Sequence, residues 1–219
     1  MEKTTSSSGR MKILIGTPIH ISKDYCMEKW LENVSKLEYP ADLLMVDNSL
    51  GLQYAEKVKG YCAKYGLTNY KIIHLEIPER GKGIHEEIHE RICRSREIIR
   101  QYFLSGDYDA WFCWECDQII PTNALDELVK LMRSGDFWVI VHNCWAENDI
   151  DFNFDFGVAL IKRNILEKYE FLPKFGTDPD VPDSWYNAEY WFKERLKKDG
   201  CRYAEVCGLI SPIYHLHNR

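Results

Sequence analysis

Four short apolar runs in the first half of the sequence are separated by segments of helical length. The runs are MKILIG (11–16), DLLMVDNS (42–49), YKIIHLEI (70–77) and AWFCWE (110–115). The segments between them, each predicted to be helical, are 22–37, 52–65 and 84–104. Strands that alternate with helices pair in parallel, because each helix carries the chain back to the same end of the sheet. We therefore expect an α/β fold with a mostly parallel, twisted sheet and helices on both faces.

The second half adds elements of both kinds to this pattern. They are a helix at 123–133, strands at 137–143 and 157–163, a helix at 184–199 and a strand at 202–210. The 219 residues, 45% of them hydrophobic, suit one globular domain, and no repeat or low-complexity linker divides them. The polar stretch MEKTTSSSGR at 1–10 is expected to be a disordered tail, which leaves a single domain at 11–219.

The charge and hydropathy of the chain exclude two classes of partner. The net charge is −6, and non-specific nucleic-acid binding needs clustered Lys and Arg, so we expect no nucleic-acid partner. No stretch approaches the roughly 18–20 apolar residues of a membrane span, so we expect no transmembrane segment. The N-terminal stretch lacks the apolar core of a signal peptide, which predicts a cytoplasmic protein.

Polar residues follow the first four predicted strands, where a parallel sheet of this kind places its ligands. They are Thr17 and His20, Asp47 and Asn48, Glu76, and Glu115 with Asp117. Two common nucleotide-binding loops are absent, because GTPIHIS after the first strand matches neither G-x-G-x-x-G nor the P-loop pattern. A nucleotide bound at this edge must therefore be held in another way.

Glu115 and Asp117 stand two residues apart at the end of the fourth strand. Alternate residues of a strand point to the same side, so the two carboxylates can converge on one cation. Hard cations such as Mg²⁺ and Mn²⁺ prefer oxygen ligands and are often held by one or two carboxylates together with substrate phosphates. The pair predicts such a metal site, and a solvated acidic pair at a strand end is the alternative.

The region around this pair resembles the nucleotide-sugar-dependent glycosyltransferases of the GT-A fold, most closely the family 2 type. The family pattern is a strand that ends in the acidic motif D-x-D, a short apolar segment with a proline, and a helix. Here DQIIP and the helix ALDELV follow the strand, and Glu115 replaces the usual first aspartate of the motif. Further segments are similar to elements of that family in the same order, over residues 11–217. They are ILIGTPIH, MVDNS, RICRSREIIRQYF, FGVALIKRNILE and AEYWFKERLKKDGCRYAEV.

This resemblance implies a donor site in the first half of the chain. Thr17 and Pro18 begin the loop that starts the nucleotide pocket, and Asp47 matches the aspartate that meets the nucleobase. Arg94 matches the arginine of an "aRN" element and is expected to reach the nucleotide or the sugar. Ser95 departs from the family at the position where asparagine is common.

The resemblance also implies a metal site. Asp117 is expected to bind Mn²⁺ or Mg²⁺ directly, and Glu115 to contact the ribose or a metal-bound water. A third ligand in the family often comes from a histidine near the C-terminus, and SPIYHLHNR offers His215 and His217. Residues two apart in an extended segment point to the same side, so both histidines are candidates; we favour His215, and surface histidines are the alternative.

A general base is implied in the helix AEYWFKERLKKDG. Its alignment with the family places Glu189 at the position of the catalytic aspartate, while Ala188 replaces the usual preceding glutamate. A surface glutamate favoured by the helix dipole is the alternative interpretation of Glu189. Asp183, in the loop just upstream, is the second candidate for the base.

These features together predict a metal-dependent glycosyltransferase. It would move a sugar from a nucleoside-diphosphate sugar, a UDP- or GDP-sugar, to a hydroxyl of a glycan, lipid or protein acceptor, with inversion and a carboxylate base. One alternative is a sugar-phosphate nucleotidyltransferase, although GTPIHIS lacks its glycine-rich, basic signature. Another is a non-catalytic relative that only binds nucleotide or glycan, which the Ser95 and Ala188 departures leave open.

Overall fold

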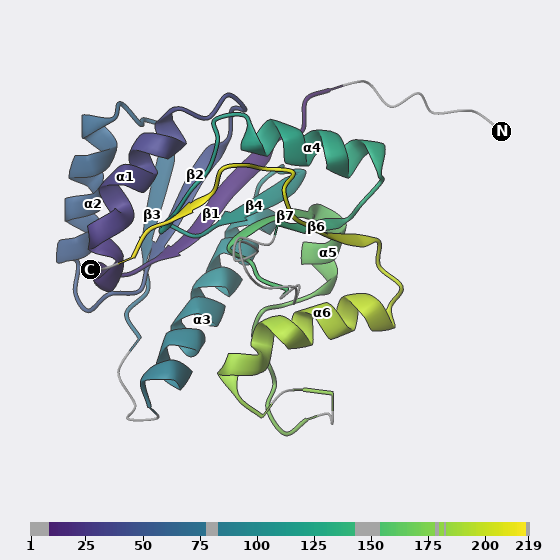
Figure 1. Ribbon diagram of the computed structural model, residues 1–219. Coiled ribbons are helices and arrows are strands. Elements are labelled where there is room, and N and C mark those ends of the chain that lie inside the picture. Colours follow the sequence, from purple (N-terminus) through teal and green to yellow (C-terminus); the bar gives the residue numbers. More distant parts are fainter. Residues whose placement is uncertain (1–8, 78–82, 143–153, 178–179, 182, 218–219) are drawn as a thin grey trace.

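A mixed sheet forms the centre of the molecule in the computed structural model, which describes residues 9–77, 83–142, 154–177, 180–181 and 183–217. Within these residues the sheet has seven strands in the order β3-β2-β1-β4-β7-β6-β8 (Figure 1). The strands are β1 (Ile13–Ile19), β2 (Asp42–Asp47), β3 (Tyr70–His74), β4 (Ala110–Trp114), β6 (Val139–His142), β7 (Val158–Lys162) and β8 (Tyr203–Val206). Of the predicted N-terminal tail, residues 1–8 lie outside the described residues.

The pairing of the strands confirms the predicted mostly parallel sheet. Strand β1 pairs in parallel with both β2 and β4, β2 with β3, and β6 with β8. Strand β7 is the exception, since it runs antiparallel to β4 and β6. The β4–β7 register continues past the strands, where the Glu115 amide donates to the Gly157 carbonyl at 2.8 Å. A Cβ on Gly157 would lie 2.4 Å from the Gln118 side chain, so this close approach requires glycine.

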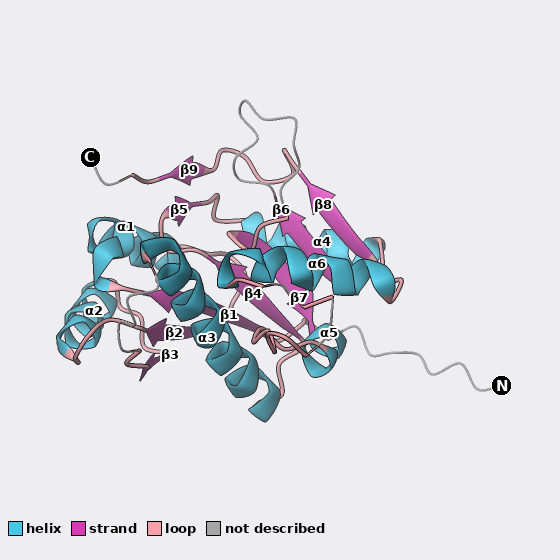
Figure 2. Cartoon of the chain, turned by 90° about the horizontal axis from the view of Figure 1, so that it is seen from below, coloured by secondary structure: helices cyan, strands magenta, loops and turns pink. Residues whose placement is uncertain are grey.

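Helices cover both faces of the sheet, as predicted (Figure 2). One face packs against α1 (Asp24–Ser35), α2 (Gln53–Lys64) and α4 (Ala124–Ser134), and the other against α3 (Ile84–Ser105), α5 (Arg163–Lys168) and α6 (Ala188–Lys198). Side chains alternate along each strand, so Ile13 and Ile15 join the first core and Leu14 the second. Both cores are therefore built by the same strands, and the sheet is buried on its two sides.

Several short elements were not predicted. Strands β5 (Gln118–Ile119) and β9 (Tyr214–His215) form a separate antiparallel pair, and Figure 2 shows them side by side. One 3-10 turn, η1 (Ile21–Lys23), precedes α1, and another, η2 (Trp185–Asn187), precedes α6, which therefore begins at Ala188 and not at residue 184. Elements of two or three residues are too short to give a periodic pattern of hydrophobicity.

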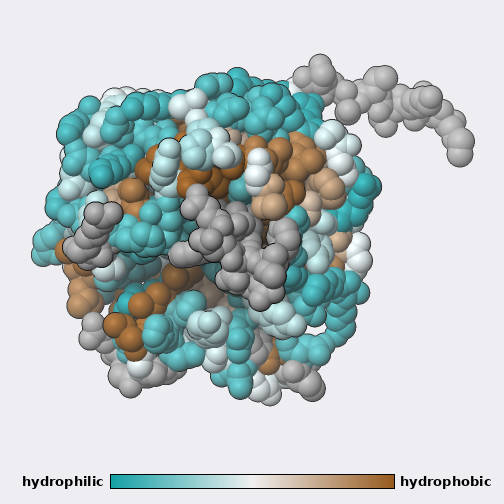
Figure 3. Space-filling view, in the orientation of Figure 1, coloured by the Kyte–Doolittle hydropathy of each residue, from teal (hydrophilic) through white to brown (hydrophobic). Residues whose placement is uncertain are grey.

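The surface carries local hydrophobic areas among mostly hydrophilic residues. Figure 3 shows one such area below α4 and another near the lower end of α3. At the start of α3, Ile84 is 70% exposed and Ile88 is 37% exposed. Across the part of the chain that the structure describes, no helix combines the length and the apolar character needed to cross a bilayer.

Candidate active site

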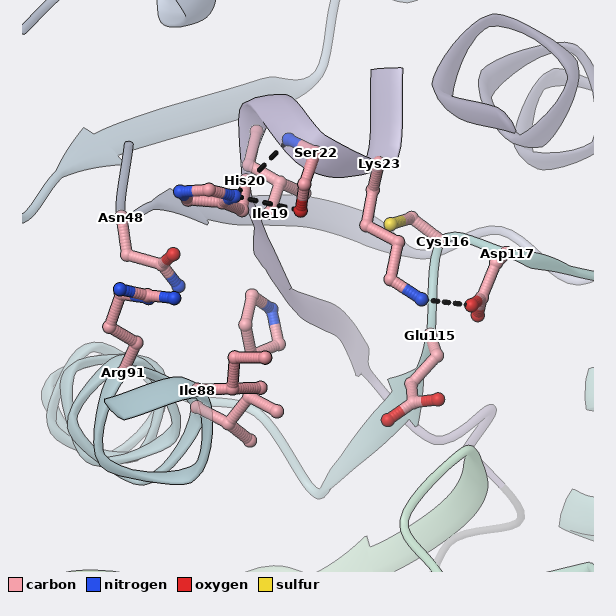
Figure 4. A pocket seen from close by; sticks show the side chains of 12 residues that line it. Ile19, His20, Ser22, Lys23, Asn48, Ile88, Arg91, Glu115, Cys116 and Asp117 are labelled. Atoms are coloured by element: carbon pink, nitrogen blue, oxygen red, sulfur yellow. Dashed lines mark hydrogen bonds and ion pairs between the residues drawn. The ribbon is translucent and has the colours of Figure 1, made fainter. Parts of the chain in front are cut away.

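A cavity of about 270 Å³ lies at the carboxyl ends of β1, β2 and β4, the edge where a sheet of this type binds ligands (Figure 4). Its walls come from the end of β1, from η1, from the residue after β2, from α3 and from the residues after β4. The lining residues are Pro18, Ile19, His20, Ser22, Lys23, Asn48, Ile88, Arg91, Ile92, Glu115, Cys116 and Asp117. Both acids of the predicted metal motif are therefore in the wall of one cavity.

The turn that presents Asp117 is held by hydrogen bonds from two buried side chains. The Trp114 indole donates to the Gln118 carbonyl at 2.8 Å. The Asn33 side chain, on α1, donates to the Ile120 carbonyl at 2.9 Å and accepts from the Ile120 amide at 2.8 Å. These bonds fix the backbone that follows Asp117 and so hold its side chain in the wall of the cavity.

The Asp117 carboxylate is almost fully buried, with 3% of its side chain exposed. Its Oδ2 atom accepts from the Lys23 ammonium and lies 3.3 Å from His215 Nε2. Burial alone would raise the pKa of Asp117, but the hydrogen bonds and charges of His215 and Lys23 outweigh it and lower that pKa. The other oxygen, Oδ1, is buried and has no hydrogen-bond partner among the described residues. One oxygen of an ionised carboxylate thus remains for a ligand.

His215 reaches Asp117 because the C-terminal segment crosses to the turn after β4. Strand β9 pairs with β5 so that His215 stands opposite Gln118. The Leu216 amide then donates to the Asp117 carbonyl at 2.7 Å, and the Tyr25 hydroxyl donates to the Leu216 carbonyl at 3.2 Å. The structure therefore places His215 against Asp117, while His217 is exposed.

Glu115 faces the cavity, with about a third (32%) of its side chain exposed. Burial of its carboxyl group, followed by the charge of Asp155, raises the pKa of Glu115 to about 8, and Arg96 opposes the shift. The Arg96 guanidinium lies 3.7 Å from the Glu115 carboxylate. Burial of Glu115 thus disfavours the ionised form that binds a metal, whereas the partners of Asp117 favour it.

Arg96 connects the acidic motif with α6. It is 1% exposed, contacts Glu115 on one side, and forms an ion pair with Glu189 on the other. Its guanidinium also lies 5.0 Å from the centre of the Phe156 ring, a cation–π distance. Glu189, the predicted base, is thereby held in the first turn of α6 with 27% of its side chain exposed. Asp183 lies upstream of η2 and is exposed.

Arg94 does not line the cavity. Its Nε atom pairs with Glu90 at 2.8 Å, and its guanidinium lies 5.5 Å from the Trp185 ring centre. The cavity instead receives Arg91 from the same helix. Sequence reasoning missed Arg91 and Arg96, although Arg91 could have been found, because it stands three residues after Ile88 and therefore on the same helical face.

The residues predicted to hold the nucleoside differ in their exposure to the cavity. Pro18 lines it, whereas Thr17 is fully buried and its hydroxyl donates to the Pro18 carbonyl at 3.3 Å. Asp47 is also fully buried; it accepts from the Ser49 amide at 3.0 Å and pairs with His74 at 3.1 Å. Asp47 therefore shapes the loop after β2.

The neighbouring Asn48 supplies the wall of the cavity at this loop. Its side-chain amide donates to the Ser95 hydroxyl on α3 at 3.0 Å. Ser95, the departure from the family pattern, thus fixes a cavity residue through a buried hydrogen bond. The serine hydroxyl gives the buried Asn48 amide a hydrogen-bond partner, so this departure leaves the cavity wall intact.

The side chains at Asp117 fit a divalent cation. A buried carboxylate oxygen without a hydrogen bond is a donor that Mn²⁺ and Mg²⁺ accept, and the adjacent imidazole nitrogen would be a second, softer ligand. In the described part of the chain, no three His, Cys, Asp or Glu side chains are grouped closely enough to hold a metal ion. Asp117 and His215 would therefore hold the ion together with water or substrate phosphate. The Lys23 ammonium contacts the same carboxylate from the cavity side.

Comparison with known proteins extends these observations. No protein-family model and no curated protein matches the sequence. Solved structures match its fold, among them a mannosyltransferase from Pyrobaculum calidifontis in complex with GDP-Man and Mn²⁺, with a TM-score of 0.66 and 14% identity over 92% of this chain. The match covers 56% of the mannosyltransferase, so this chain spans little more than half of its length.

Two bacterial enzymes match in the same way. S. aureus TarS 1-349 in complex with UDP has a TM-score of 0.59 and 12% identity, over 90% of this chain and 61% of that one. Glucosyl-3-phosphoglycerate synthase from Mycobacterium tuberculosis, in complex with Mg²⁺ and UDP, has a TM-score of 0.59 and 14% identity. The match covers 95% of this chain and 72% of the synthase. At these identities the likeness concerns the fold, and it agrees with the motif order in the sequence. This chain therefore has the α/β fold of the GT-A glycosyltransferases.

Proposed function

We propose that this protein is a glycosyltransferase that moves a sugar from a nucleoside-diphosphate sugar to an acceptor hydroxyl with the help of Mn²⁺ or Mg²⁺. One observation carries the proposal: Asp117, with one unpartnered oxygen and His215 beside it, lies in the wall of a cavity at the carboxyl edge of a GT-A sheet. Solved structures of the same fold have GDP-Man with Mn²⁺, or UDP with Mg²⁺. A UDP- or GDP-sugar is accordingly the proposed donor.

The cavity has the composition that a nucleoside diphosphate requires. Pro18, Ile19 and Ile92 supply apolar surface for a nucleoside, and Asn48 supplies an amide for polar contacts. Asp47 would act on the nucleoside by positioning Asn48 and the Ser49 amide. Lys23 and Arg91 line the same cavity and bring positive charge to a chain whose net charge is −6.

Proposed roles follow for the residues around the phosphates. Asp117 and His215 would hold the divalent cation, which when bound neutralises charge on the diphosphate leaving group. Glu115 would contact the ribose or a water on the ion. Arg94 contacts Glu90 and Trp185, so its proposed role is to support α3 at the donor site.

Glu189 is the proposed base. It would take the proton of the acceptor hydroxyl as that oxygen attacks the anomeric carbon and the bond from this carbon to the diphosphate breaks, with inversion. The contact that supports this role is the ion pair with Arg96, because Arg96 also reaches Glu115 in the cavity wall. Asp183 is the second candidate, and the acceptor is a glycan, lipid or protein hydroxyl.

Calorimetry and product analysis test this proposal. UDP and GDP are titrated with and without Mn²⁺, and we expect one of them to bind with an affinity that depends on the metal. UDP- and GDP-sugars are then incubated with Mn²⁺, and we expect slow release of the nucleoside diphosphate through donor hydrolysis. Release of pyrophosphate from nucleoside triphosphates would instead identify a nucleotidyltransferase. Metal-dependent binding without any release would identify a binding protein.

A further inference from the structure

Lys23 occupies one side of the carboxylate that is proposed to bind the metal. Its ammonium donates to Asp117 Oδ2, the oxygen that also faces His215. The position of Lys23 is fixed by η1, whose first turn is capped where the Ser22 amide donates to His20 Nδ1 at 3.1 Å. Figure 4 shows the Lys23 side chain extending from η1 to Asp117 along the cavity wall.

The burial of the two partners is unequal. The Asp117 side chain is 3% exposed, whereas that of Lys23 is 42% exposed. A buried carboxylate is strongly destabilised when it loses a paired cation, so Asp117 needs a positive charge beside it. Lysine carries a compact charge on a flexible stem, so the partly exposed Lys23 side chain can move its ammonium away from Asp117 and keep it in the cavity.

We propose that Lys23 is an exchangeable cation, which neutralises Asp117 until a divalent ion binds there, then gives way and turns to the anionic donor. The inference rests on the proposed function for the identity of the donor, but the exchange itself concerns only Asp117, Lys23 and the metal. An ammonium and a divalent ion repel each other at one carboxylate, so the two compete. Metal affinity is therefore reduced by the free energy of the Lys23–Asp117 pair.

The exchange has a consequence opposite to that of a structural ion pair. Removal of a residue that only supports the site would weaken metal binding. Removal of a competitor strengthens it. Lys23→Met keeps most of the side-chain length and removes the charge, so we expect Mn²⁺ alone to bind the variant about tenfold more tightly than the parent, equivalent to about 1.4 kcal/mol. Lys23→Arg keeps the charge and can pair with the carboxylate through two N–H groups, so it should bind Mn²⁺ no more tightly than the parent.

Calorimetric titration of the full chain with Mn²⁺ in the absence of nucleotide measures this difference. Lys57→Met is the matched control, because Lys57 pairs with Asp24, the residue next to Lys23, at 2.6 Å and the variant has the same net charge. Its Mn²⁺ affinity should equal that of the parent. A second titration, of UDP and GDP at saturating Mn²⁺, should show weaker binding to Lys23→Met by about tenfold, since the cavity has lost a cation.

Two results would overturn the exchange. One is an Mn²⁺ affinity of Lys23→Met that equals or falls below that of the parent, in a variant whose circular dichroism shows that it is folded. The other is a parent that binds no Mn²⁺ but binds UDP or GDP through Lys23, which would make the lysine a permanent substitute for the metal. If Lys23→Met binds Mn²⁺ more tightly and no nucleotide binds to any variant, the exchange at Asp117 stands and the proposed donor is wrong.

Discussion

The two halves of the chain contribute to the candidate site in different ways. Among the described residues, all those that line the cavity precede residue 118, and they come from the β-α-β part of the sheet. The second half contributes side chains at the edge, among them His215 against Asp117 and Glu189 against Arg96. We infer that the first half binds the donor and that the second half supplies the catalytic groups.

This division has a physical basis in how each half is built. Parallel strands deliver their carboxyl ends to one edge, so Pro18, Asn48 and Asp117 come together wherever the sheet forms. His215 depends instead on a two-residue strand, and Glu189 on one buried arginine. The donor site should thus tolerate changes in the second half better than transfer does.

The largest expected effect is that of Asp117→Ala, which tests whether the first half binds the donor through a metal. Removal of the direct ligand leaves the charge of the diphosphate uncompensated, so binding of UDP or GDP in the presence of Mn²⁺ should weaken by about 10³-fold. Calorimetry with and without Mn²⁺ measures it. Glu115→Ala is the comparison and should weaken binding less; an unchanged affinity in Asp117→Ala would remove the metal from the proposal.

Glu189→Gln tests the catalytic role of the second half. The substitution keeps the size of the side chain but removes the group that takes the proton, so transfer or donor hydrolysis should fall by about 10²-fold or more. Binding of donor and metal should stay close to that of the parent. Asp183→Asn is the matched control and should keep most of its turnover. The opposite result, with Asp183→Asn inactive and Glu189→Gln active, would place the base in the loop.

Arg96→Met tests the contact between the halves. Arg96 is buried and faces two carboxylates, so its loss should lower the free energy of unfolding by about 2 kcal/mol, less than for a fully buried pair because both acids reach solvent. Urea denaturation measures this. Arg94→Met breaks one pair, in which the arginine is 35% exposed and Glu90 is buried, and should cost no more than Arg96→Met, which breaks two. A larger loss in Arg94→Met would mean that α3 is fixed at Trp185 and not at the acidic motif.

The sequence predicts local elements of the fold but not the contacts between residues that are far apart in the chain. The first four strands are predictable because each is a short apolar run, and the helices between them because each is long enough to show a period; Glu115 and Asp117 follow from their place at a strand end. Arg96 could not be found in this way, since a charged residue in a charged helix gives no sign that it is buried. The contact of Lys23 could not be predicted either, because its partner Asp117 is 94 positions away in the sequence.

The smallest expected effect separates the two C-terminal histidines. The β5–β9 register turns His215 toward Asp117 and leaves His217 exposed, so His215→Ala should reduce Mn²⁺ affinity by about tenfold and His217→Ala should leave it unchanged. The effect is smaller than that of Asp117→Ala because the Asp117 carboxylate remains. Calorimetry with Mn²⁺ alone compares the two variants. Donor binding without metal should be equal in both, since neither histidine lines the described cavity. If His217→Ala loses the metal and His215→Ala keeps it, the C-terminal segment pairs two residues out of register, and the second half contributes to the site by a different route.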